Sequence, residues 1–261
     1  MSSLALSEEQ VFADFARRFD IRDATILELG GNLAADLQGA AGLWVALDER
    51  RAALESDEHA VQARCEAIPM RSGAVDAVFS CNALQFVDVG STLSEVRRVL
   101  RPGGVFYAHF GPIWSGIDGH QLEYVTHEGV DLVFWRDPLI PPWGHLLFDE
   151  VELRDILLAK LDPGLVETVV HHVYVSDTIN RLFFEDYIEI VLKSGLEWVE
   201  VAASYELDYP LTTPEYAMDR ADIESTVVED LLYERTGRRL EVGVRDLRVV
   251  LRRAANDRSL D

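Results

Sequence analysis

The chain of 261 residues has little lysine, little cysteine and no long apolar run. Its only lysines are Lys160 and Lys193, and its only cysteines are Cys65 and Cys81. Two cysteines cannot form a disulfide framework, and no cysteine or histidine spacing resembles a zinc site, so we expect a cytoplasmic protein without a metal. No apolar run reaches the roughly 18 residues of a membrane span, and segment 1–20 has the pattern of an amphipathic helix rather than a signal peptide.

Positive charge is also scarce. Acidic side chains number 46 against 24 Lys and Arg, which gives a formal net charge of −22 at pH 7. Such a surface repels phosphate backbones and anionic membranes, so we exclude nucleic acid and membranes as partners and expect a small-molecule substrate. The oligomeric state is left open.

Short apolar runs alternate with helical patterns between residues 24 and 110. The runs lie at Thr25–Leu29, Leu43–Leu47, Val75–Ser80 and Val105–Ala108, with a weaker one at Val61–Cys65. Continuous apolar runs are typical of strands buried on both faces, as in a parallel sheet. The pattern predicts an α/β fold with a doubly wound, mostly parallel, Rossmann-like sheet of about seven strands, whose ligand site lies beyond the carboxyl ends of the strands.

One helical pattern lies between the third and the fourth of these stronger strands, with its apolar face within residues 93–100. Thr92 and Glu95 are three residues apart, which predicts a capping box at the start of this helix. The turn Arg101-Pro102-Gly103-Gly104 is expected to end the helix and to lead the chain into the next strand.

The second half of the chain has a different composition. Residues 111–149 are rich in Gly, Pro, Trp and His without a clear period, and predict a lid insertion. The apolar run Val169–Val175 is expected in a strand or at the surface. Later helices are expected at Val151–Leu161, ending at Asp162-Pro163-Gly164, at Arg181–Lys193 and within Pro214–Glu234, and later strands at Leu196–Leu207 and Val242–Leu251.

The predicted organisation is one domain with additions. Residues 1–23 form an N-terminal helix and possible lid, and residues 24–110 form a cofactor-binding core. Residues 111–149 form the substrate or lid insertion, and residues 150–261 are the remainder of the same domain, closing the sheet.

Two acidic residues end the first two strands. Glu28 precedes Gly30-Gly31, and Asp48 follows twenty residues later. In a right-handed strand–helix–strand unit this spacing brings Asp48 beside the first turn, where a carboxylate can accept both hydroxyls of a ribose. The alternative is that Asp48 only caps the next helix and Gly30 only turns the chain. The fingerprint G-x-G-x-x-G is missing, which disfavours a nicotinamide-dependent oxidoreductase.

Five motifs follow one another in a recognisable order: Ile26–Gly30, Leu47-Asp48, Glu66–Met70, Val75–Ser80 and Glu95–Gly104. Together they resemble class I S-adenosylmethionine-dependent methyltransferases, in particular bacterial enzymes for small molecules. The resemblance covers residues 24–110 in register, and the Arg-Val-Leu-Arg-Pro-Gly-Gly turn is its most specific part. It implies S-adenosylmethionine as cofactor and methyl transfer to a small molecule.

The resemblance also implies cofactor contacts. Glu28 and Gly30 would lie near the methionine end of the cofactor, and Asp48 would bind its ribose. Cys65 and Glu66 would flank the adenine, with Ile68 and Met70 as apolar cover. Asn82 would face both cofactor and substrate.

Three residues depart from the pattern of this family. Asn32 and Ala34 replace the second and third glycines of its first motif. Arg64 replaces an acid that commonly accepts a hydrogen bond from the adenine amino group, and arginine cannot accept one. These departures motivate the alternative of a methyltransferase-fold protein without methyl transfer: a pseudoenzyme, a partner subunit or a catalyst of another reaction.

A hydroxyl acceptor would benefit from a general base, and histidine is the usual base near pH 7. We expect His145 or His109 in this role, although either can also be a buried structural imidazole. His171 and His172, if in a strand, would face opposite ways and could not bind one ion. Substrate contacts are expected from Trp114, His120, Tyr124, Trp143 and Arg181, while the aromatic cluster of the insertion could equally be a small satellite core.

Overall fold

A computed structural model describes residues 7–31, 33–50, 59–122, 125–133, 138–205 and 225–257. The chain divides into two compact units. The first, here called the sheet unit, comprises Met1–Gly111, Asp186–Ser204 and Asp246–Asp261. The second, here called the helical unit, comprises Pro112–Glu185 and Tyr205–Arg245.

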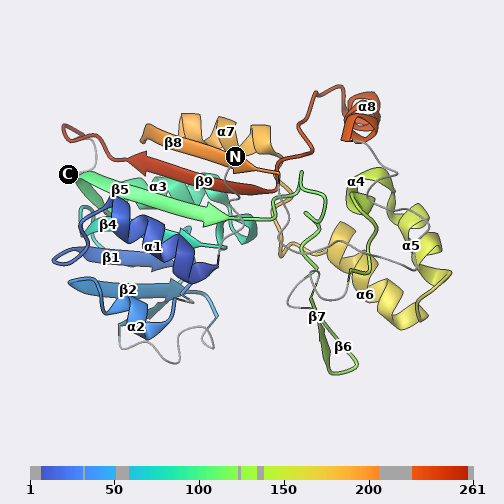
Figure 1. The fold of residues 1–261 in the computed structure, drawn as a ribbon, viewed down its shortest axis with the longest axis horizontal. Helices are drawn as coiled ribbons and strands as arrows, with labels where there is room; N and C mark the ends of the chain where they lie inside the picture. The colour runs from blue at the N-terminus through green and yellow to red at the C-terminus, as the bar shows by residue number, and fades with distance from the viewer. Residues whose placement is uncertain are drawn as a thin grey trace. The chain divides into compact units, whose positions relative to one another are not determined.

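The sheet unit is built on one seven-stranded sheet in the order β3-β2-β1-β4-β5-β9-β8 (Figure 1). The first five strands in this order are parallel, and β9 runs antiparallel to both β5 and β8. This confirms the predicted doubly wound α/β fold. The strands are β1 (Thr25–Leu29), β2 (Leu43–Asp48), β3 (Ala60–Gln62), β4 (Val75–Cys81), β5 (Leu100–Phe110), β8 (Glu197–Ser204) and β9 (Asp246–Arg252).

Helix α1 (Glu8–Arg18) belongs to the core of the sheet unit and lies across one face of the sheet (Figure 1). Its side chains Phe12 and Phe15 are buried against an aromatic cluster in which the rings of Phe79 and Tyr107 stack at 6.0 Å. The helix begins with a capping box formed by Ser7 and its third residue. The segment expected as a possible lid is therefore packed as a core helix.

Asp14 joins α1 to the sheet by polar contacts. Its carboxylate is 8% exposed and accepts hydrogen bonds from the Tyr107 hydroxyl at 2.9 Å, from Arg18 Nε at 2.8 Å and from Arg17. Burial alone would raise the pKa of Asp14, but the hydrogen bonds from Arg17 and Tyr107 and the charges of Arg18 and Arg248 outweigh it and lower the pKa. Asp14 is thus expected to stabilise the fold in its charged form.

Replacement of Asp14 by Asn tests this link. At pH 7 we expect Asp14→Asn to lower the free energy of unfolding by at least about 2 kcal/mol, because a nearly buried anion with three donors is lost. Since the folded-state pKa is lowered, the stabilisation is present above the unfolded-state pKa of about 3.9 and is lost as the pH falls through the folded-state value. Chemical denaturation at pH 7 and pH 3 should therefore show a difference from wild type that shrinks in acid. Asp20→Asn, at an exposed pair with Arg22, is the control and should change little; an equal loss there would contradict the account.

The helices of the sheet unit are α1, α2 (Ala35–Gln38), η2 (Leu84–Phe86), α3 (Val89–Val99) and α7 (Phe184–Lys193), of which α7 begins in the helical unit. Helix α3 begins at Asp88, whose side chain accepts a hydrogen bond from Ser91 N at 2.6 Å. The predicted capping box of Thr92 and Glu95 is wrong, because Thr92 lies one turn inside the helix and is fully buried. Glu95 instead accepts from Ile68 N at 2.8 Å.

The helical unit contains the hairpin of β6 (Val125–His127) and β7 (Val130–Leu132) and the helices α4 (Gly144–Leu147), α5 (Glu150–Leu158), α6 (Pro163–Tyr174) and α8 (Ser225–Thr236). Asp162 caps the start of α6 by accepting from Gly164 N at 2.7 Å, with Pro163 as the first helical residue. The predicted helix end at Asp162-Pro163-Gly164 is therefore a helix start. The strand expected at Val169–Val175 is also wrong, since these residues belong mainly to α6.

Packing explains why residues 150–185 group with residues 112–149 rather than with the sheet. Leu153 and Leu157 of α5 and Val166 of α6 form one apolar cluster with Leu122 and Ile140. This differs from the expected assignment of residues 150–261 to the sheet domain. The predicted helix within 214–234 starts at Ser225 in the described part of the chain, and residues 214–224 lie outside it. None of the described helices combines the length and the apolar character that crossing a membrane requires.

Candidate functional site

The carboxyl ends of β2, β1 and β4 lie side by side in the sheet unit. Leu29 at the end of β1 is in register with Leu47 of β2 and with Ser80 of β4. Gly30, Asp48 and Asn82, which follow or end these three strands, therefore share one edge of the sheet. The structure brings together the residues that the sequence placed at separate strand ends.

The turn after β1 has an unusual backbone. Gly30 and Gly31 have φ angles of 109° and 55°, and a Cβ atom on Gly30 would lie 3.0 Å from the Cβ of Ala83. A side chain at position 30 is therefore excluded by both strain and contact. Asn32 lies outside the described residues, and Ala34 begins α2 without a side-chain cap.

Glu28 supports this turn from inside the protein. The residue is 2% exposed, and its carboxylate accepts hydrogen bonds from Leu33 N at 2.9 Å and from Trp44 Nε1 at 2.7 Å. One carboxylate thus joins β1, the residues after the glycine turn, and β2. Both oxygens accept a hydrogen bond from the protein, so Glu28 braces the turn.

Glu28→Gln tests the brace. An amide has one accepting oxygen, so its NH2 group would face one of the two donors in a buried site. We expect the free energy of unfolding to fall by about 2–4 kcal/mol in urea denaturation, against less than about 0.5 kcal/mol for Glu9→Gln on the exposed side of α1. Equal effects of the two changes would show that the Glu28 hydrogen bonds carry no special weight.

Asp48 ends β2 and has an arginine as its partner. Its Oδ1 accepts from Arg50 N at 2.6 Å, and the Arg50 guanidinium adds two longer contacts of 3.2 and 3.3 Å to the carboxylate. The Asp48 side chain is 7% exposed and that of Arg50 is 49% exposed. The short backbone bond fixes the carboxylate, and the longer guanidinium contacts would compete with a diol for its two oxygens. Sequence reasoning missed Arg50, although it lies only two residues after Asp48.

The segment after β3 contains Cys65 and Glu66. Burial, followed by the charges of Glu66 and Asp48, raises the pKa of the Cys65 thiol to about 12, so Cys65 is a neutral, apolar wall at pH 7. Glu66 accepts from Asp88 N at 2.9 Å and forms an ion pair with Arg64. The Arg64 side chain is 68% exposed, so it lies in solvent beside Glu66.

Asn82 and His109 lie together at the ends of β4 and β5. Asn82 adopts a left-handed backbone with φ of 52°, is exposed, and donates its N–H to His109 O at 2.9 Å. His109 is 3% exposed and is in register with Cys81. Of the two histidines expected as bases, His109 is the one at this edge of the sheet.

Most of the residues at this edge of the sheet lie in a segment that is similar to known proteins. Residues 30–108 match the family model described as a methyltransferase domain. This part of the chain is similar to a methyltransferase domain. The match begins at the glycine turn and ends within β5, so it includes Asp48 and Asn82.

Curated relatives match the same kind of domain over a limited length. An uncharacterized methyltransferase of Mycobacterium tuberculosis is 40% identical over 83 residues, which cover 32% of this chain and 32% of that protein. A malonyl-acyl-carrier-protein O-methyltransferase of Enterobacter lignolyticus is 33% identical over 89 residues, covering 30% of this chain and 36% of that protein. The matched segments thus span about a third of each relative.

Solved structures show the fold over nearly the whole chain. An S-adenosylmethionine-dependent methyltransferase from Mesorhizobium loti has a TM-score of 0.52 at 17% identity, covering 96% of this chain and 100% of that chain. A geranyl diphosphate C-methyltransferase from Streptomyces coelicolor has a TM-score of 0.50 at 12% identity, covering 95% of this chain and 79% of that chain. The chain therefore has the S-adenosylmethionine-dependent methyltransferase fold.

Outside the methyltransferase domain, the helical unit buries three histidines together. The rings of His120 and His145 lie 5.6 Å apart, and His172 Nε2 lies 2.9 Å from His120 O. His145 Nε2 donates to Trp114 O at 2.8 Å, and its Nδ1 is buried without a hydrogen-bond partner in the described part of the chain. Burial lowers the pKa of His145 to about 4, and burial with the neighbouring imidazoles lowers that of His120. His145 is therefore a neutral and weak base at pH 7.

The other predicted substrate contacts are engaged in the packing of the helical unit. Trp143 donates its Nε1–H to Val242 O at 2.8 Å and is 8% exposed. Arg181 donates to the carbonyls of Val173 at 3.0 Å and Ser176 at 2.6 Å, so it caps the end of α6. Its guanidinium also lies 5.5 Å from the ring centroid of Trp114. Tyr124 lies outside the described residues. The expected aromatic cluster is thus, where described, a satellite core.

The predicted strand placement of His171 and His172 is wrong. Both residues lie in α6, where His172 is buried and His171 is exposed. Among the described residues, no group of three or more His, Cys, Asp or Glu side chains is arranged to hold a metal ion.

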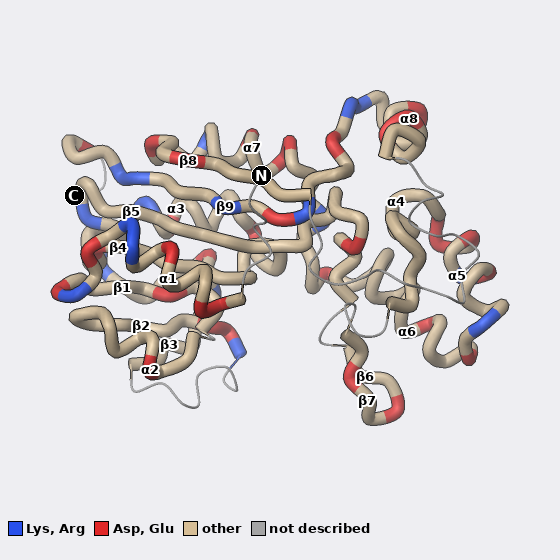
Figure 2. The backbone as a smooth tube through the Cα atoms, in the orientation of Figure 1, with Lys and Arg blue, Asp and Glu red and all other residues tan. Residues whose placement is uncertain are grey.

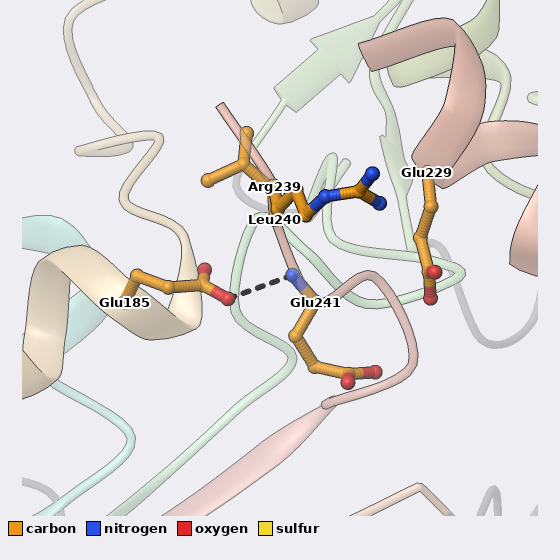
Figure 3. A pocket seen from close by; sticks show the side chains of 5 residues that line it. All are labelled: Glu185, Glu229, Arg239, Leu240 and Glu241. Carbon is orange, nitrogen blue, oxygen red and sulfur yellow. Dashed lines mark hydrogen bonds between the residues drawn. The ribbon is translucent and has the colours of Figure 1, made fainter. Parts of the chain in front are cut away.

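A cavity of about 240 Å³ in the helical unit is lined by Glu185, Glu229, Arg239, Leu240 and Glu241 (Figure 3). Glu185 accepts a hydrogen bond from Glu241 N at 2.8 Å. Ligand pockets typically measure roughly 300–1,000 Å³ and have mainly apolar walls. This smaller, charged hollow does not have the character of a substrate pocket, and no sequence motif indicated it.

The buried imidazoles predict a dependence of stability on pH. Because the folded-state pKa of His145 is about 4, the unfolded state binds more protons once the pH falls below about 6.5. The free energy of unfolding should therefore fall between pH 6.5 and pH 4, and His145→Gln should reduce this fall because the amide does not titrate. Urea denaturation at several pH values measures both slopes. An unchanged slope in the variant would contradict the buried neutral state of His145.

Proposed function

We propose that the protein transfers a methyl group from S-adenosylmethionine to a small-molecule acceptor, most simply a hydroxyl group. The observation that carries the proposal is the arrangement of Asp48 and the Gly30-Gly31 turn at one edge of adjacent parallel strands. A carboxylate at the end of β2 suits the two hydroxyls of a ribose, and a turn without side chains allows close approach of a ligand. Acidic residues are spread over both units, which favours a small acceptor over nucleic acid (Figure 2).

The described residues fit this methyl donor. Asp48 would hold the ribose, the buried Cys65 and Ile68 would flank the adenine, and Gly30 and Asn82 would lie toward the methionine end. When bound, the donor supplies a methyl group already activated on a sulfonium, so the protein has mainly to position the acceptor. Arg64 does not oppose the fit, since its side chain lies in solvent.

A hydroxyl acceptor has to lose a proton. We assign this role first to His109, which lies at the same edge of the sheet as Asn82. His145 is a weaker candidate because of its low pKa. We assign recognition of the acceptor to the insertion of residues 111–149.

A protein of the same fold without methyl transfer is the second candidate. It is favoured by the contact of Arg50 with Asp48, which occupies the carboxylate that a ribose would need. Absence of S-adenosylhomocysteine binding would favour this second candidate, because a protein that has lost the donor site would not bind it.

Paired variants test the donor site by isothermal titration calorimetry with S-adenosylhomocysteine. Asp48→Asn should weaken binding at least about tenfold, because one accepting oxygen is lost. Arg50→Gln should strengthen binding by about two- to fivefold, because the guanidinium no longer competes for the carboxylate.

Unchanged affinity in Asp48→Asn would remove the ribose assignment. Weaker binding in Arg50→Gln would show that Arg50 contacts the ligand instead of competing with it.

A further inference from the structure

Gln85 is a buried polar residue to which the proposed donor site assigns no role. It lies in η2, three residues after Asn82, and is 4% exposed. Its amide oxygen is buried and has no hydrogen-bond partner in the described part of the chain. Such an oxygen is costly to bury, and buried polar groups are normally satisfied by protein, water or ligand. The amide oxygen is therefore available to a donor from outside the chain, if its place in the fold brings it near a ligand.

This residue lies close to the glycine turn. The position of a Cβ on Gly30 is 3.0 Å from Ala83 Cβ, and Ala83 O accepts the N–H of Phe86 at 3.0 Å within η2. Gln85 is thus in the short helix that adjoins the turn, at the ends of β1 and β4. It is on the opposite side of β2 from the segment after β3.

The order of the strands indicates which end of a bound methyl donor would lie near Gln85. If a ribose lies at Asp48 on β2, the base and the 5′ substituent extend to opposite sides. The side of β3 offers buried Cys65 and Ile68, which suit an apolar, flat base. The side of β1 and β4 offers glycine, Asn82 and Gln85, which suit a polar amino-acid group.

The expected acidic partner for an ammonium group on that side is not free. Glu28 is fully engaged by Leu33 N and Trp44 Nε1. An ammonium group at the glycine turn has three N–H donors, so it would gain from a further acceptor beside Glu28.

We propose that the amide oxygen of Gln85 accepts a hydrogen bond from the α-ammonium group of the amino-acid end of the methyl donor. The proposal rests on the proposed function and adds a positioning residue to the donor site. It predicts that Gln85 distinguishes ligands with the amino-acid end from those without it.

Gln85→Met tests the proposal with two ligands, S-adenosylhomocysteine and 5′-methylthioadenosine, which lacks the amino-acid end. Calorimetry should show about a tenfold loss of affinity for S-adenosylhomocysteine and less than about a twofold change for 5′-methylthioadenosine. Without ligand, the melting temperature should be unchanged or higher, because an unsatisfied buried oxygen is removed. Gln85→Glu should retain binding of S-adenosylhomocysteine, since a carboxylate also accepts from an ammonium.

Thr92→Val is a matched control. The Thr92 hydroxyl in α3 is also buried and has no hydrogen-bond partner within the described residues. Its removal should leave the affinity for both ligands unchanged.

Three results for Gln85→Met would overturn the assignment. The affinities for both ligands could fall in parallel, or neither could fall. The melting temperature could also fall while both affinities stay unchanged. If wild type binds neither ligand, the proposed function itself fails. If wild type binds both and Gln85→Met behaves like wild type, only the role of Gln85 fails.

Discussion

The hydrogen bonds of Glu28 hold together the part of the molecule on which the site depends. The carboxylate is buried and joins Leu33 after the glycine turn to Trp44 of β2. Through these bonds the first turn is fixed relative to the neighbouring strand, and Gly30 can approach Ala83 closely. Glu28, which the sequence suggested near the ligand, thus shapes the backbone of the turn.

The sheet unit supports this edge from the other side of its core. Phe12 and Phe15 of α1 pack with Phe79 and Tyr107, and Asp14 adds a charged link to the same tyrosine. This arrangement keeps β4 and β5 covered by apolar surface up to the residues that precede Asn82. The aromatic core therefore fixes the strands by packing, and the strands in turn position the polar groups at their ends.

Much of the sheet unit could be predicted from the sequence, because its parallel strands are buried on both faces and appear as continuous apolar runs. The ligand edge followed from the same pattern, since Gly30, Asp48 and Asn82 directly follow or end such runs. Helix starts were less predictable where two caps compete: Asp88 and Thr92 both suit a cap, and only burial of Thr92 decides between them.

Long-range polar partners could not be predicted. The hydrogen bond of His145 to Trp114 joins segments distant in sequence, and no local pattern encodes it. The same holds for Gln85, whose amide stands out only because its surroundings offer it no donor. Trp143 and Arg181, which the sequence suggested as substrate contacts, donate hydrogen bonds to backbone carbonyls of the helical unit.

A crystal structure with bound S-adenosylhomocysteine tests the central claim most directly. The account predicts the ribose hydroxyls on Asp48 with the Arg50 guanidinium displaced, while Glu28 keeps its bonds to Leu33 and Trp44. A nucleoside bound elsewhere, or a Glu28 carboxylate turned away from the brace to contact the ligand, would contradict it.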